Sequence, residues 1–151
     1  MAIDRSERAA ATRRQGRPSR SYQAGRSRTE AEMKALQSAK IRELGYALAI
    51  AGILSLDKQA EALGLSRSTT WTILKGNHKA SGLSAAVINR ILAARQLPKQ
   101  VRAKVIEYIV EKAAGYYGHS ETLRSRFIAR LSIKQSERAK LEEIPRFQPP
   151  R

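Results

Sequence analysis

The sequence lacks cysteine altogether and holds few aromatic or acidic residues. Without cysteine the chain has no disulfide, no thiolate nucleophile and no cysteine-bound zinc, which is typical of a reducing compartment such as the cytoplasm. Aromatic residues make up 5% of the chain and hydrophobic residues 42%, so a core is possible and must be mainly aliphatic. A length of 151 residues leaves room for one domain of ordinary size with tails.

Long hydrophobic runs are missing too. The apolar stretch 45–56 has an alanine-rich centre and is shorter than the roughly 20 residues that span a bilayer. The N-terminus lacks the apolar segment and the cleavage site of a secretory signal. We therefore expect no membrane association.

Groups suited to catalysis are sparse. His78 and His119 are the only histidines, 41 residues apart, and no carboxylate cluster near them resembles a metal site. The 13 acidic residues form no helix-spaced pair for acid–base work, and no glycine-rich loop stands between a strand and a helix. We expect no enzymatic activity, no metal, no cofactor and no small-molecule substrate.

The acidic residues are outnumbered by 29 lysines and arginines, and the net charge is +16. Such a charge indicates a partner with dense negative charge. Nucleic acid is the commonest one, because each phosphate that meets a basic side chain releases condensed counterions. An anionic membrane surface and a soluble protein with a basic tail are the alternatives.

Residues 1–28 hold eight arginines against two acids, Asp4 and Glu7. Almost nothing in this segment can be buried, so we expect a disordered Arg-rich arm. Such an arm can wrap phosphates or enter a minor groove. Its composition also resembles an organellar transit peptide, and a non-specific tail is the simplest interpretation.

Helical signals begin at Thr29, which forms a potential capping box with Glu32 and predicts a helix to about residue 53, interrupted by Gly45. The apolar residues spaced along one face of this helix are Leu36, Ile41, Leu44, Leu48 and Ala51. Shorter helices are expected at about 56–63, 67–75, 85–95, 98–114 and 120–131, started by Ser55, Ser66, Ser84, Pro98 and Ser120.

No segment alternates like a strand, so the predicted fold is all-α, a bundle of five to seven helices. We divide the chain into the arm (1–28), a helix-turn-helix domain (29–96), C-terminal helices that complete the core or form a dimer interface (97–133), and a short helix with a frayed tail (134–151).

The stretch 55–76, SLDKQAEALGLSRSTTWTILKG, predicts two short helices joined by a tight turn. Ala60 is small enough for a helix crossing, and Gly64 tolerates the positive φ of the turn. Ser66 caps the second helix, whose free N–H groups suit a phosphate. The apolar residues that would lock the pair are Leu56, Leu63, Leu65 and Ile73.

These residues resemble the helix-turn-helix of the Cro and lambda-repressor-like family. The matching positions are Leu54, Ser55, Ala60, Leu63, Gly64, Leu65, Ser66, Ser68, Thr69 and Gly76. The resemblance covers roughly residues 30–95 and implies a lambda-repressor-like helical bundle. Three positions depart from the family: Leu56 replaces a glutamine that supports a phosphate contact, and Gln59 and Thr70 replace apolar residues.

The resemblance implies that the second helix of the motif enters the major groove. Arg67 would contact a guanine edge, and Trp71 would either touch a thymine methyl or sugar or pack into the core. Ser68 and Thr72 would reach a base or phosphate, and the positions after the helix would contact the backbone. The implied DNA-binding residues are Ser66, Arg67, Ser68, Trp71, Thr72, Lys75, Asn77, His78 and Lys79.

A second register remains open. Residues 64–74 (GLSRSTTWTIL) are echoed by 82–92 (GLSAAVINRIL), eighteen residues later. The second copy and the sequence after it, to about residue 109, are similar to the headpiece of the Lac-repressor family. That resemblance implies that Ser84, Asn89 and Arg90 would face DNA.

The predicted helix 98–114 is apolar on two sides, so it is either central to the core or shared with a second copy. One face carries Val101, Val105, Tyr108 and Ile109, and its neighbour carries Ile106, Val110 and Ala113. We expect a homodimeric, cytoplasmic (nucleoid-associated) transcriptional regulator that binds double-stranded DNA. A non-specific nucleoid or RNA-associated protein and an antitoxin-like helical adaptor are the alternatives.

Overall fold

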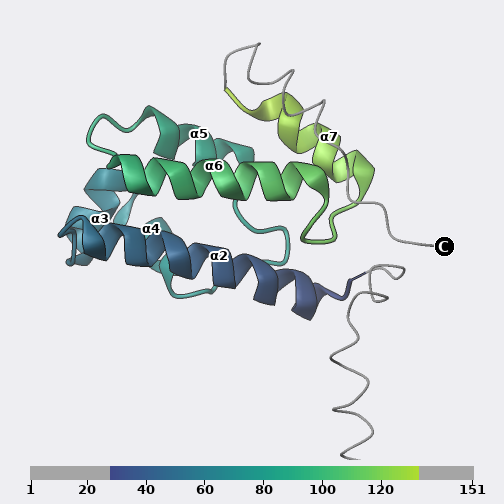
Figure 1. Ribbon diagram of the computed structural model, residues 1–151, viewed down its shortest axis with the longest axis horizontal. Coiled ribbons are helices and arrows are strands. Elements are labelled where there is room, and N and C mark those ends of the chain that lie inside the picture. Colours follow the sequence, from purple (N-terminus) through teal and green to yellow (C-terminus); the bar gives the residue numbers. More distant parts are fainter. Residues whose placement is uncertain (1–27, 133–151) are drawn as a thin grey trace, which may run out of the picture. The chain divides into compact units, whose positions relative to one another are not determined.

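The computed structural model describes residues 28–132, which form an all-helical unit and contain no strand. Figure 1 shows the helices, which are α2 (Glu30–Ile50), α3 (Leu56–Leu63), α4 (Arg67–Leu74), α5 (Ala85–Ala93), α6 (Lys99–Ala114) and α7 (Glu121–Arg130). The predicted all-α class is thereby confirmed. The expected disordered arm, apart from Arg28, and the short helix and tail at 134–151 lie outside the described residues.

Short polar side chains start the helices as the sequence predicts. Thr29 and Glu32 form a reciprocal capping box at α2, with Thr29 Oγ1 accepting from the Glu32 N–H at 3.1 Å. A serine caps each of four further helices by accepting a backbone N–H three residues on; these are Ser55, Ser66, Ser84 and Ser120. Pro98 stands just before α6 rather than in its first turn.

Two helices end earlier than expected. α2 stops at Ile50 because the chain turns through Gly52, whose φ is +85°. α5 stops at Ala93 because Ala94 is extended. Leu97 precedes a proline, which also disfavours continued helix there.

α2 and α6 lie side by side and run in opposite directions (Figure 1). Three ion pairs join them along the seam, Lys40 to Glu107 at 2.9 Å and to Glu111 at 3.4 Å, and Lys104 to Glu43 at 3.0 Å. Burial by itself would lower the pKa of Lys40, but its hydrogen bond to Glu107 and the surrounding carboxylates raise that pKa overall. The seam therefore holds its acidic residues already neutralised by lysines.

α6 is central to the core. Val101 and Val105 are fully buried, and so is Ala113 on the neighbouring face. Of that second face only Ile106 is clearly exposed, at 42%. The apolar surplus of this helix is therefore accounted for by packing against α2, α5 and α7, and not by a broad exposed face.

Gly64 makes the turn between α3 and α4 with a left-handed backbone, φ +67°. A Cβ built on it would lie 3.1 Å from both the Ala94 Cβ and the Arg90 carbonyl oxygen. The position therefore requires glycine for its backbone conformation and also for its contact with the end of α5.

Gly64→Ala is expected to lower the free energy of unfolding by about 1–2 kcal/mol, because alanine is strained at positive φ. Gly45→Ala is the matched control: it changes the same atoms inside α2, where a Cβ meets nothing within 4 Å. There we expect stabilisation by about 0.5–1 kcal/mol. Urea unfolding followed by circular dichroism measures both. Effects of the same sign would contradict this account of the turn.

Candidate nucleic-acid interface

α3 and α4 are joined by the three residues Gly64, Leu65 and Ser66. Leu63, Leu65 and Ile73 are buried and hold the pair against the core, as the sequence predicts. Leu56, expected to share this role, is only half-buried at the start of α3. The helix pair thus rests on the core through its turn and the inner face of α4.

The polar residues of α4 divide between the two sides of the helix. Thr70 is fully buried, and its hydroxyl donates to the Ser66 carbonyl at 2.8 Å. That bond satisfies the buried hydroxyl. The side chains that α4 and its caps expose are Ser66, Arg67, Ser68, Trp71, Thr72 and Lys75, which are predicted site residues.

Arg67 forms an exposed ion pair with Asp57 of α3, with 3.4 Å between the guanidinium and the carboxylate. Both side chains are more than two-thirds exposed, so the pair contributes little to stability. The guanidinium is therefore held beside the front of α4 and remains accessible to another acceptor.

Trp71 is 46% exposed, so the interpretation that this residue packs into the core is wrong. Its side chain borders an open hollow on the outer surface of the helix pair. The hollow is lined by Leu56, Arg67, Ser68, Trp71 and Thr72. A large apolar ring therefore lies among the polar residues of α4.

The segment after α4 holds three exposed predicted contacts, Lys75, Asn77 and Lys79. The expected backbone contact by His78 does not fit its position, since this residue is only 6% exposed. Its Nε2 lies 3.1 Å from the Ser38 hydroxyl and its Nδ1 lies 2.9 Å from the Lys79 carbonyl oxygen. His78 thus ties the segment to α2, and we remove it from the candidate interface.

Buried polar side chains fix the same segment from α2 and α6. Gln37 donates to the Ala80 carbonyl at 2.6 Å and accepts from the Tyr108 hydroxyl at 2.5 Å. That hydroxyl also accepts from the Leu83 N–H at 2.9 Å. Each buried backbone group here gains a partner, so the chain leaving α4 has a defined path.

Lys112 of α6 completes this arrangement. Its ammonium donates to the carbonyl oxygens of Ser81 at 2.7 Å and Leu83 at 2.8 Å, and lies 4.4 Å from the centre of the Phe127 ring. Burial lowers the pKa of Lys112 to about 8. The sequence offers no sign that this lysine, among so many exposed ones, faces inward.

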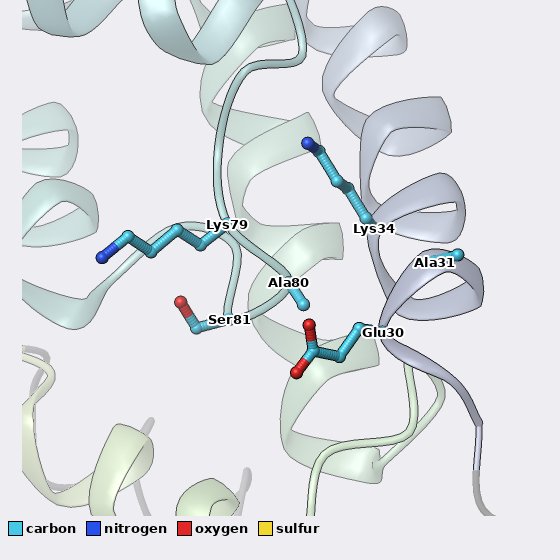
Figure 2. A pocket seen from close by; sticks show the side chains of 6 residues that line it. All are labelled: Glu30, Ala31, Lys34, Lys79, Ala80 and Ser81. Carbon is cyan, nitrogen blue, oxygen red and sulfur yellow. The ribbon is translucent and has the colours of Figure 1, made fainter.

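Figure 2 shows a second hollow beside the segment, lined by Lys34 of α2 and by Lys79, whose side chain extends away from α2. The Glu30 carboxylate and Ser81 lie at its lower edge. Lys34 was not among the sequence-predicted residues. It joins the candidate interface because the contact between Gln37 and Ala80 brings the first half of α2 beside the segment.

The second register places Ser84, Asn89 and Arg90 on α5 or its cap. Ser84 caps the helix, and Arg90 is exposed. The Asn89 amide donates to the Arg130 carbonyl at 3.0 Å and accepts from the Ser132 N–H at 2.7 Å. Asn89 therefore closes the end of α7, and both ends of its amide are engaged within the protein.

Comparison with known proteins yields no match to any family model, curated protein or solved structure. Within residues 28–132, no group of His, Cys, Asp and Glu side chains could hold a metal ion. No helix in that part of the chain is both long and apolar enough to cross a membrane. The candidate interface is thus defined by its own geometry.

His119 is a buried titratable group whose ionisation couples stability to pH. It is 4% exposed, and its pKa is lowered to about 4 by burial and by the nearby cations Lys112 and Arg124, against opposing contacts with the backbone of Ala80 and Ser81. The unfolded chain therefore takes up this proton first, near pH 6.5. The contribution of His119 to the free energy of unfolding is therefore complete above about pH 6.5, and it is lost as the pH falls towards 4.

Between pH 7 and pH 5 we expect the free energy of unfolding to fall by roughly 1–2 kcal/mol through this group. Hydrogen bonds from Lys104 and Lys40 lower the pKa of Glu43 and Glu107, respectively, so these carboxylates stay ionised in that window. Urea titrations at the two pH values measure the fall. His119→Leu is expected to flatten it, and an unchanged slope in that variant would refute the assignment.

Proposed function

We propose that the chain is a sequence-specific regulator that binds duplex DNA by placing the exposed face of α4 in the major groove. The observation that carries this proposal is the outward position of Arg67, Ser68 and Thr72 directly after the turn at Gly64. Side chains at the front of a helix, projecting from a rigid helix pair, are suited to reading base edges.

The charge distribution supports the same partner. Lys75 and Lys79 follow α4, and Lys34 lines the same hollow as Lys79. These side chains are placed to contact phosphates, which position a protein on the duplex without specifying sequence. Glu43 and Glu107 lie on the α2–α6 seam, where lysines neutralise them, whereas Asp57 and Glu30 border the interface itself.

Selection of bound fragments from a random duplex library should recover one recurrent sequence. Its affinity should exceed that for random duplex by at least 1,000-fold at physiological salt. A non-specific nucleic-acid-binding protein would instead lose all binding together as salt rises. Binding of no duplex at all would favour a protein-interaction adaptor and refute the proposal.

Arg67→Ala is expected to weaken binding to the selected site by roughly 1–3 kcal/mol and to relax one base position. Arg67→Lys is the matched control, since lysine keeps the charge but loses the bidentate hydrogen bonding of the guanidinium to guanine. It should bind random duplex like the wild type and the selected site as poorly as the alanine variant. Equal losses on both duplexes in Arg67→Ala would make Arg67 a phosphate contact instead.

The proposed regulator acts as a homodimer, which allows two half-sites to be read together. Because Ile106 is the only large apolar side chain that α6 exposes, we place the dimer contact at the end of α2. Tyr46 and Ile50 lie one turn apart on that helix, 62% and 78% exposed, and Leu54 follows them at 73%. Exposed apolar side chains gathered in this way are typical of interaction sites.

Ile50→Lys should convert the protein to a monomer, because burying an unpaired ammonium opposes association. Ile106→Lys, which changes an exposed isoleucine of α6, should leave the dimer intact. Sedimentation velocity across a concentration series distinguishes the two. A wild-type chain that is monomeric throughout would remove the dimer from the proposal while leaving DNA binding by α4 to be judged separately.

A further inference from the structure

The hollow beside Trp71 has two apolar walls. Trp71 supplies one from α4, and Leu56 supplies the other from the start of α3. A tryptophan 46% exposed keeps much of its ring in water, which is unfavourable unless a partner covers it. The hollow therefore offers an apolar group a surface to pack against.

Polar and charged residues form the rest of the lining. Arg67, Ser68 and Thr72 border the hollow and come from the same helix face that we assign to the major groove. With a net charge of +16, the chain favours a polyanion as the occupant of this surface. On the major-groove edge of duplex DNA the apolar group is the 5-methyl group of thymine.

We propose that this hollow receives the methyl group of a thymine in the DNA that α4 reads. The inference rests on the proposed function and adds a base to it. Arg67 and Trp71 are four residues apart, so their side chains lie on one face about 6 Å from each other. Base pairs rise by about 3.4 Å, and the thymine should therefore lie one or two base pairs from the guanine that Arg67 contacts.

Leu56 is the feature that distinguishes this site from a bare exposed tryptophan. The resembled family often carries a glutamine at this position, and the leucine here is half-buried, with part of its side chain in the hollow. An apolar side chain cannot support a phosphate by hydrogen bonding. It can instead form the second wall of a pocket for a methyl group.

The experiment uses the full chain and the duplex recovered by the selection described above. Each thymine is replaced in turn by uracil, which removes only the methyl group. Wild-type protein should lose about fourfold in affinity at one position, the effect of withdrawing one buried methyl. Trp71→Ala should bind the thymine and uracil duplexes equally, and Leu56→Ala should reduce the difference between them.

Tyr116→Ala is the matched control, because Tyr116 is an aromatic residue of similar exposure, 45%, outside the proposed interface. It should keep the full response to uracil. Trp71 is the only tryptophan in the chain, so its fluorescence reports on this site alone. Its quenching by acrylamide should decrease when the selected duplex is bound and increase again with the uracil duplex.

If a selected duplex exists and no uracil replacement weakens wild-type binding, the thymine assignment is wrong and the proposed function stands. An equal uracil response in wild type and Trp71→Ala would likewise overturn it. If the selection recovers no sequence, the proposed function fails and this inference fails with it. Protection of Trp71 by a protein and not by DNA would identify the hollow as a protein-docking site.

Discussion

The direction of α4 depends on the left-handed turn at Gly64. The turn packs against the end of α5, with Arg90 and Ala94 close to the glycine, so the helix pair cannot pivot without losing this contact. At the other end of α4 the chain is held by Gln37, Tyr108 and Lys112 through backbone groups of residues 80–83. A short helix fixed at both ends presents its outer side chains with little freedom, and such preorganisation reduces the entropy lost on binding.

Local signals allowed much of this architecture to be predicted from the sequence. Serines before α3, α4, α5 and α7 and the box at Thr29 cap their helices as expected, because capping depends on residues only three positions apart. Helix ends were predicted less well, as at Ile50 and Ala93, since they depend on turns and packing. The all-helical class follows from these short-range rules.

The candidate site was only partly predictable, because exposure depends on the whole fold. His78 follows a polar helix in a basic segment, yet it faces α2 and is buried. Trp71 is a residue type that usually packs in the core, yet it lies on the surface. Lys112 and Lys34 look alike in sequence, but one is inside and the other outside. Contacts between residues far apart in the sequence, 40 positions for His78 and about 30 for Lys112, decide such cases, and no local pattern encodes them.

The pairing of Arg67 with Asp57 has a consequence for how a groove would be searched. In the proposed complex, the guanidinium leaves a carboxylate on its own surface whenever it engages DNA. A phosphate presents two non-bridging oxygens to the guanidinium, and a guanine edge presents O6 and N7. In the proposed complex Asp57 would compete with either acceptor, and because the exposed pair is weak this competition would be small.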